Sequence, residues 1–224
     1  MSNITSDFKL GDLVLYKNNQ LIAFNKPATL AVQRDKSEDK ALIDLGEIYY
    51  KSKLHIIHRL DRPASGVVLF AKNKKALAAL NEQFKNRTIA KTYLAVVKNL
   101  PNPSSGNLIH YLTKNNSGTK SIVMGDEKKG KKAELKYELL KSIDNYHLLK
   151  IELITGRFHQ IRAQLAAIDN PIKGDVKYGF RRGNKDRSIH LHAWKLSFEH
   201  PVSKLTETIT APLPKDSIWD AFQL

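Results

Sequence analysis

The chain has 224 residues, 42% of them hydrophobic and 26% charged, which is enough to bury a real core and excludes a chain that is disordered over most of its length. It has no cysteine, which excludes disulfide bonds and cysteine-based zinc sites. Lys and Arg number 37 against 22 Asp and Glu, and the net charge of +15 favours a polyanionic partner, with ordinary solubility as the plainer alternative.

The first half of the chain is predicted to form short strands and two helices after an N-terminal arm, residues 1–12. Pro27 cannot donate a hydrogen bond to a strand ladder, so it ends the second strand. Leu77, Leu80 and Phe84 form an apolar stripe at helical spacing. We expect strands at residues 13–16, 21–25 and 67–71, and helices at residues 41–50 and 74–87.

The second half is predicted to add strands and one helix. Residues 101–106 are a loop, either a surface loop or a hinge between two lobes. Residues 114–132 are rich in Lys, Gly and Asn, which fits a solvated hairpin tip or a contact with a nucleic-acid backbone. We expect strands at 91–97, 133–140, 146–153, 189–198 and 205–210, a helix at 157–168, and a basic loop at 174–187. This pattern is α+β, with mostly antiparallel neighbours.

Several other classes of protein are disfavoured. None of the eight His residues stands in an H-x-x-x-H or H-E-x-x-H arrangement, so no metal site is expected. The N-terminus lacks the apolar core of a secretory signal, and no apolar run approaches the ~20 residues that span a bilayer. We therefore expect a cytoplasmic protein, and the lack of a basic amphipathic helix with an aromatic face argues against membrane binding.

A polar turn between two apolar stretches carries Asp61. Arg59 and Arg62 flank this residue and would keep its carboxyl ionised, which suits a nucleophile or a base better than a proton donor. Pro63 fixes φ and Gly66 permits close approach, so the turn can be held rigid against a ligand. On these residues alone, a carboxylate that caps a turn or pairs with Arg on the surface is the simpler alternative.

A second cluster opens a helix after Gly156. Arg157, His159, Gln160 and Arg162 line the polar faces of its first turns. Helix N-termini favour anions, and two guanidinium groups add bidentate partners for carboxylate or phosphate. Ordinary polarity at a helix start is the alternative.

Tyr93 lies two residues after Lys91 on a predicted strand. A tyrosine on a strand usually packs in the core or against a cross-strand neighbour. Its functional use would be to stack on a nucleobase.

The segment around Asp61, from His58 through Ser65-Gly66 to Phe70-Ala71-Lys72, resembles the signature loop of the RluA-type RNA pseudouridine synthases. The match extends from about residue 13 to residue 213, and six segments in the same order are far more specific than any one of them. The further matching segments are Asn25-Lys26-Pro27-Ala28, Lys91–Ala95, Gly156–Arg162, Gly174-Asp175 with Tyr178-Gly179, and Leu191-His192-Ala193 with Phe198–Pro201.

The chain departs from the family pattern in places that bear on substrate choice rather than on the chemical groups. Thr29 stands where Gly is usual, Ala64 where Thr is usual, and Phe158 where Thr or Ser is usual. Ala163-Gln164 replaces a common Val-His pair.

The resemblance implies a pseudouridine synthase fold: a mixed, mostly antiparallel central sheet in two lobes flanked by helices, with an active-site cleft between them. Residues 13–224 would form the catalytic domain. The small S4-like RNA-binding domain that many relatives carry is expected to be absent, because about a dozen residues precede the first strand.

The resemblance also implies a mechanism without metal or cofactor. The enzyme would break the C1′–N1 bond of a flipped uridine, turn the uracil and join C1′ to C5. Asp61 would either attack C1′ or remove the 2′ proton, and both routes stay open. Arg162 would pair with Asp61, and Tyr93 would stack on the uracil and assist removal of the C5 proton. Arg59 would fill the space of the flipped base or hold a phosphate.

The other residues expected to contact RNA come from the same motifs, and His58 among them either touches RNA or only shapes the loop. They are His58, Arg62, Lys91, Arg157, His159 and Gln160. The expected partner is a 23S ribosomal RNA or transfer RNA stem-loop, bound by a monomer.

Two alternatives belong to other classes. An inactive RNA-binding or ribosome-assembly factor of the same fold would also be basic. A glycosidase or a two-metal nuclease is disfavoured, because it needs paired or clustered carboxylates and Asp61 stands alone among cations. The roles of the basic segments 128–132 and 181–187 are left open.

Overall fold

The computed structural model describes residues 9–34 and 39–224, so most of the predicted arm lies outside the described residues. The chain forms two compact units: unit 1 combines the residues up to Ile89 with Ala193–Pro212, and unit 2 combines Ala90–His192 with Leu213–Leu224. Of the two alternatives for residues 101–106, a surface loop or a hinge between two lobes, the hinge is wrong, because these residues lie inside unit 2. The hydroxyl of Tyr137 donates to the carbonyl of Pro103 at 3.0 Å and ties the loop to its own unit.

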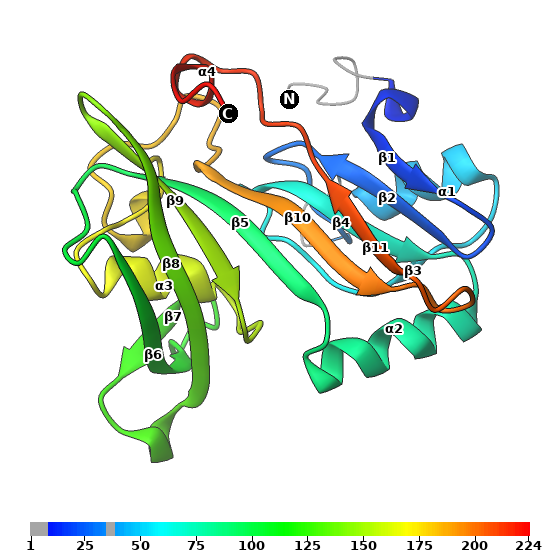
Figure 1. Cartoon of the computed structure of the whole chain (residues 1–224), viewed down its shortest axis with the longest axis horizontal. Coiled ribbons are helices and arrows are strands. Elements are labelled where there is room, and N and C mark those ends of the chain that lie inside the picture. Colours follow the sequence, from blue (N-terminus) through cyan, green and yellow to red (C-terminus); the bar gives the residue numbers. More distant parts are fainter. Residues whose placement is uncertain (1–8, 35–38) are drawn as a thin grey trace. The chain divides into compact units, whose positions relative to one another are not determined.

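Unit 1 is built on a sheet in the order β1-β2-β4-β10, with β11 paired to β10 and β3 paired to β4 (Figure 1). The β1–β2, β2–β4, β3–β4 and β10–β11 pairs are antiparallel. The strands are β1 (Val14–Lys17), β2 (Leu21–Lys26), β3 (His55–Ile56), β4 (Ser65–Ala71), β10 (Leu191–Glu199) and β11 (Thr206–Thr210). The 3-10 helix η2 (Leu10–Leu13) precedes β1.

Two helices cover opposite faces of this sheet, because alternate residues of a strand point to opposite sides. Leu21 packs in one cluster with Leu80 of α2 (Lys74–Asn86). Ile22 packs in another cluster with Leu42 of α1 (Leu42–Tyr50). Every residue of β4 is buried, as expected for a central strand with helices on both sides.

Unit 2 is an antiparallel sheet in the order β5-β9-β8-β6-β7. Helix α3 (Gln160–Ala166) packs on it, with Ala163 against Leu112 and Ala133. The strands are β5 (Ala90–Val97), β6 (Ser105–Lys114), β7 (Ser121–Met124), β8 (Lys131–Ile143) and β9 (Tyr146–Leu153). Two 3-10 helices, η3 (Glu127–Lys129) and η4 (Val176–Tyr178), lie in its connections.

The last helix, α4 (Ser217–Ala221), is short but well anchored in unit 2. The carboxylate of Asp216 accepts from the backbone N–H groups of Ile218 and Trp219 at 2.8 and 3.0 Å, an N-cap that satisfies otherwise unpaired donors. The buried indole of Trp219 stacks on the ring of His190 with centroids 5.5 Å apart. Burial is the main reason that the pKa of His190 falls to about 4.

The mostly antiparallel α+β class is confirmed, and most predicted elements are present within a few residues. Strands β3, β6 and β7 and helix α4 were not predicted. Helix α3 begins three residues later than expected, because His159 adopts a left-handed conformation (φ 49°) that cannot belong to the helix. The predicted cleft between the lobes stays a prediction.

Candidate active site

Asp61 lies in a tight turn that leads directly into β4. The backbone N–H of Ala64 donates to the carbonyl of Asp61 at 3.1 Å, which closes the turn over Arg62-Pro63. Asp61 is partly buried and Arg59 is exposed. The turn therefore presents a carboxylate on a constrained backbone.

Arg62 ties this turn to the loop that follows β2. Its Nε donates to the carbonyl of Thr29 at 2.9 Å, and the N–H of Thr29 donates back to the carbonyl of Arg62 at 2.7 Å. Its Nη2 lies 2.6 Å from the carboxylate of Asp39. Thr29 has a positive φ of 71°, a conformation in which glycine is far less strained. The usual glycine of the family pattern thus has a structural reason.

Lys26 is fully buried beneath the same loop and turn. Its ammonium has three N–H donors and three acceptors: the carbonyls of Pro27, Leu30 and Arg62, at 2.9, 2.8 and 3.2 Å. Burial lowers the pKa of Lys26 to about 7, while the negative charge of Asp61 opposes that shift. Lys26 therefore joins the loop and the turn through hydrogen bonds and couples electrostatically to Asp61.

His58 and Gly66 fix the two ends of the turn against unit 1. The Nε2 atom of His58 accepts from the N–H of Leu69 at 3.0 Å, and its ring stacks on Phe84 with centroids 5.4 Å apart. This geometry supports a role for His58 in shaping the loop. Gly66 has φ 114°, and a Cβ there would lie 2.2 Å from the carbonyl oxygen of Ala193, so only glycine fits.

Arg162 lies on α3 in unit 2 and is held by a buried carboxylate. Its Nε and Nη2 donate to the two oxygens of Asp175 at 2.6 and 2.8 Å, and the two side chains are only 5% and 1% exposed. The guanidinium also lies 4.9 Å from the ring centroid of Tyr178. These contacts use two of the five N–H donors and fix the plane of the group. The pairing of Arg162 with Asp61 stays a prediction.

His159 and Phe158 form a stacked pair directly before α3, with ring centroids 3.8 Å apart. The Nδ1 atom of His159 lies 3.0 Å from the hydroxyl of Tyr178, and that hydroxyl accepts from the N–H of Ser121 at 2.7 Å. The ammonium of Lys114 lies 4.9 Å from the ring centroid of Phe158. The left-handed backbone of His159 is therefore held in place by contacts of its own side chain.

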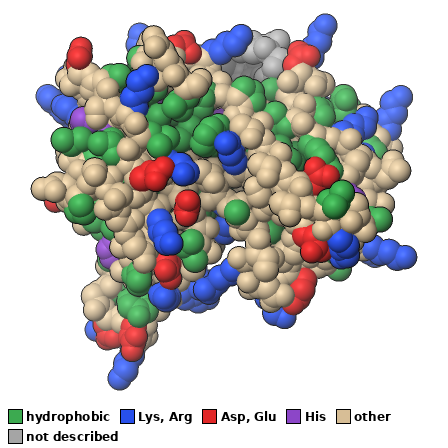
Figure 2. Space-filling model, in the orientation of Figure 1, with side chains coloured by type: hydrophobic (Ala, Val, Ile, Leu, Met, Phe, Trp, Pro, Cys, Tyr) green, Lys and Arg blue, Asp and Glu red, His purple; other side chains and the backbone are tan. Residues whose placement is uncertain are grey.

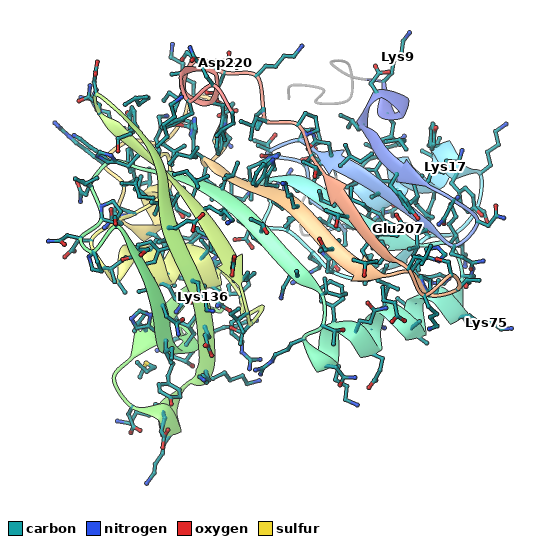
Figure 3. All side chains as sticks on the ribbon, in the orientation of Figure 1. Lys9, Lys17, Lys75, Lys136, Glu207 and Asp220 are labelled. Carbon is teal, nitrogen blue, oxygen red and sulfur yellow. The ribbon has the colours of Figure 1, made fainter. Side chains whose placement is uncertain are left out.

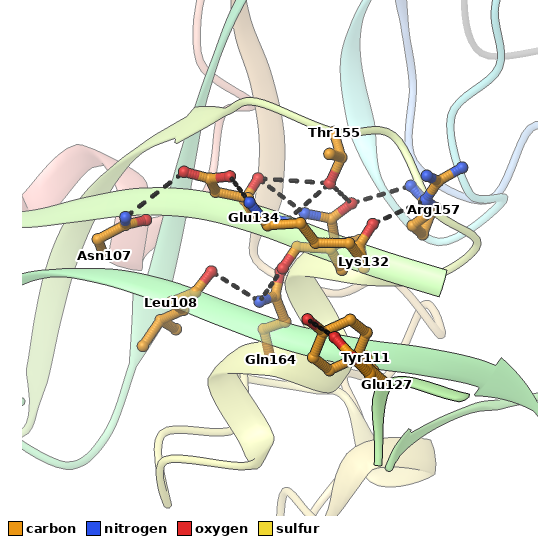
Figure 4. A network of polar contacts seen from close by, with 11 residues as sticks. Asn107, Leu108, Tyr111, Glu127, Lys132, Glu134, Thr155, Arg157 and Gln164 are labelled. Atoms are coloured by element: carbon orange, nitrogen blue, oxygen red, sulfur yellow. Dashed lines mark hydrogen bonds and ion pairs between the residues drawn. The ribbon is translucent and has the colours of Figure 1, made fainter. Parts of the chain in front are cut away.

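Gln160 is buried within a polar network at the start of α3, and Figure 4 labels its partners Glu134, Thr155 and Arg157. Its Oε1 accepts from the hydroxyl of Thr155 at 2.7 Å and from the N–H of Arg157 at 2.9 Å. Its Nε2 donates to the carbonyl of Glu134 at 3.0 Å, and the Nε of Arg157 donates to the carbonyl of Lys132 at 3.0 Å. Both ends of the Gln160 amide are thus engaged in holding the backbone of the motif.

Tyr93 and Lys91 lie on β5 and are partly buried. Because they are two residues apart on a strand, their side chains share one face. Tyr93 is opposite Ile151 of β9 in the register. Both residues lie in unit 2 together with Arg157, His159 and Arg162.

The sequence did not identify Lys26 or Asp175 as members of the site. Both lie inside matching segments, but nothing in a local pattern shows that a lysine folds back on three carbonyls or that residue 175 pairs with residue 162. No group of three or more His, Asp or Glu side chains in the described part of the chain could hold a metal ion. Among the described residues, no helix is long and apolar enough to cross a membrane.

Comparison with known proteins gives consistent results. Residues 20–167 match a family model described as RNA pseudouridylate synthase. The chain is 34% identical over 213 residues to ribosomal large subunit pseudouridine synthase C of Rickettsia conorii, covering 91% of this chain and 68% of the relative. It is 32% identical over 208 residues to an uncharacterized RNA pseudouridine synthase of Mycoplasma genitalium, with the same coverage.

A solved structure has the same fold over nearly its whole length. Human RNA pseudouridylate synthase domain containing 4 superposes with a TM-score of 0.75 and 25% identity, covering 92% of this chain and 90% of the human one.

Proposed function

The chain belongs to the RNA pseudouridylate synthase family and is an RNA pseudouridine synthase, an isomerase, and we propose that Asp61 supplies the carboxylate of its reaction. The reaction breaks the C1′–N1 bond of a uridine and forms a C1′–C5 bond. The base leaves with the bonding electron pair, turns, and reattaches through C5, and the C5 proton is lost to N1 or solvent. Atoms and charge therefore balance without a co-reactant.

The observation that carries this proposal is the construction of the Asp61 turn. Lys26 and Arg62 bind the turn to the loop after β2 through hydrogen bonds at 2.6 to 3.2 Å. A carboxylate on such a backbone needs little reorganisation during reaction, which is how positioned groups lower a barrier. Attack on C1′ and removal of the 2′ proton both fit this geometry.

Roles in unit 2 are proposed for Arg162 and Tyr93, which lie in two of the matching segments. Arg162 would keep Asp61 ionised, and its own orientation is fixed by Asp175. Tyr93 would stack on the target uracil and assist loss of the C5 proton. Contacts to RNA are proposed for His58, Arg59, Arg62, Lys91, Arg157, His159 and Gln160, and Gln160 would act mainly by holding the backbone of Arg157.

The proposed substrate is a stem-loop of 23S ribosomal RNA or of transfer RNA, bound by a monomer in the cytoplasm. The names of the relatives support the ribosomal choice, and the net charge of +15 supports a polyanion. Stem-loops are favoured because an unpaired uridine costs least to flip.

The experiment is to map pseudouridine in total RNA from cells with and without this gene. A uridine that is modified only when the gene is present identifies the substrate. If every pseudouridine persists without the gene, and the purified protein binds RNA but forms no product on total RNA from those cells, the chain is an inactive RNA-binding member of the fold.

A further inference from the structure

Six lysines gather at the end of unit 1 that lies farthest along β4 from the Asp61 turn. The pairings Leu21↔Ala71 and His55↔Ala71 bring the β1–β2 turn, the start of β3 and the end of β4 together there. The end of α1 and the start of α2 flank the same place, and Figure 3 labels Lys17 and Lys75 at this end. This set, called the lysine surface, consists of Lys17, Lys51, Lys53, Lys72, Lys74 and Lys75.

The charges of the lysine surface are close together. The ammonium of Lys17 lies 5.2 Å from the ring centroid of Tyr49, and that of Lys72 lies 4.5 Å from the ring centroid of Tyr50, the next residue. Burial, and then repulsion from Lys17, lowers the pKa of Lys72. No carboxylate of the described residues lies within 4 Å of any of the six ammonium groups.

Helix α2 adds to this positive potential. Its first turn carries Lys74 and Lys75 and no acidic residue, although the N-terminal end of a helix is itself positive and normally favours acids. Lys85, in the last turn of the same helix, is instead paired with Glu82 at 3.7 Å. Lys and Arg side chains project from much of the displayed face (Figure 2). Glu47 lies beside the lysine surface, but its carboxylate accepts from the backbone N–H of Leu54 at 3.0 Å and forms no ion pair with the six lysines. Such crowding lowers stability unless an anion binds.

We propose that the lysine surface binds backbone phosphates of a double-helical RNA segment that flanks the target uridine. The inference rests on the proposed function for the position of the target. Lysines lie over the rings of both Tyr49 and Tyr50, so the surface offers ammonium groups rather than open rings for stacking unpaired bases. Phosphate contacts of this kind position a duplex without reading its sequence.

The length of β4 sets the distance of this contact from the target. Its seven residues, Ser65–Ala71, span roughly 20 Å at about 3.3 Å per residue. A duplex advances by roughly 3 Å per base pair, so the contact falls about six to seven base pairs from the flipped nucleotide. A stem of about 12 base pairs reaches the lysine surface, whereas a stem of about four does not.

The test uses two fluorescent RNA hairpins with one uridine-containing loop and stems of about 4 and about 12 base pairs. Binding is measured over a range of salt concentrations in an Asp61→Asn background, so that no turnover occurs. The variant Lys17→Gln/Lys74→Gln removes two charges, and Lys17→Arg/Lys74→Arg is the charge-preserving control. Lys85→Gln is the location control on the same helix.

The double Gln variant should lower affinity for the long hairpin by roughly 10- to 60-fold at about 0.1 M salt, and reduce its salt slope by about two, because each lost phosphate contact releases about 0.9 fewer counterions. The affinity of the double Gln variant for the short hairpin should stay within about twofold of the parent. The two control variants should bind both hairpins within about twofold of the parent.

An equal loss for both hairpins, or no loss for either, overturns the proposal. So does a double variant that keeps its RNA affinity but no longer sediments with phosphatidylserine vesicles, since the surface would then bind membranes. If the variants show the expected loss for the long hairpin only, but the unmutated protein forms no pseudouridine in any cellular RNA, the proposed function fails while the lysine surface stands.

Discussion

Replacing Lys26 by Met tests whether a buried ammonium supports the catalytic turn. Met has a similar length but offers no donor to the carbonyls of Pro27, Leu30 and Arg62. Unmade hydrogen bonds to buried carbonyls cost about 1–3 kcal/mol each, and relief from burying a charge offsets part of that loss at neutral pH. The turn should loosen, and the rate constant at saturating RNA should fall by about 10- to 100-fold, as expected when a catalytic group shifts by about 1 Å.

The stability of the same variant should differ from that of the unmutated protein in a pH-dependent way. Burial lowers the pKa of Lys26 from 10.5 to about 7, so between these values the unfolded chain binds more protons than the folded one. Stability from this residue therefore rises with pH across that window, and the buried ammonium is most costly below pH 7. The full shift corresponds to a change of about 5 kcal/mol in the free energy of unfolding across this pH window. The Met variant lacks this pH-dependent contribution.

Urea unfolding of both proteins at pH values from 7 to 10.5 measures this difference. As the pH rises, the free energy of unfolding of the unmutated protein should increase by a few kcal/mol relative to that of the Met variant. In an Asp61→Asn background the rise should begin at lower pH, because Asp61 opposes the shift. A difference that stays flat or shrinks with rising pH would refute the reasoning.

Three further changes have expected outcomes. Thr29→Gly should raise the free energy of unfolding by about 1 kcal/mol in urea titrations, because φ is 71° there; a loss of stability would contradict this. Gly66→Ala should lower the melting temperature sharply or prevent folding, since its Cβ would lie 2.2 Å from the oxygen of Ala193; an unchanged melting curve would show that β10 moves freely. Asp175→Asn should lower the free energy of unfolding in urea by about 3–5 kcal/mol, because it removes a charged partner of the buried Arg162, and adding Arg162→Met should recover part of that loss; no recovery would contradict a stabilising ion pair between Asp175 and Arg162.

The sequence predicted the strongly patterned elements well. Helix α2 has an apolar stripe and an Asn73 cap, and β4 is a continuous apolar run, so their local patterns match their environments. Strand β6 was missed because three of its four exposed residues are polar, which resembles a loop, and β7 because it has only four residues within a segment rich in Lys, Gly and Asn. The late start of α3 was missed because the left-handed conformation of His159 depends on Phe158 and Tyr178, which a helical pattern does not show.

The candidate site was predictable to the extent that its residues occur in recognisable segments. Asp61, Tyr93 and Arg162 were selected by those segments, and their catalytic roles stay predictions. The supporting contacts were not predictable, because Lys26 meets Arg62 across 36 positions and Arg162 meets Asp175 across 13. The first pair forms because β2 and β4 are neighbours in the sheet, and the second because the chain after α3 folds back onto that helix.

The most direct measurement is single-turnover formation of pseudouridine by Asp61→Asn, with the substrate RNA identified by mapping and RNA affinity determined in parallel. The account predicts that product falls below detection while the dissociation constant changes little, because the amide keeps the shape of the carboxyl but can neither attack nor accept a proton. Product formed at a rate near that of the unmutated enzyme would contradict it.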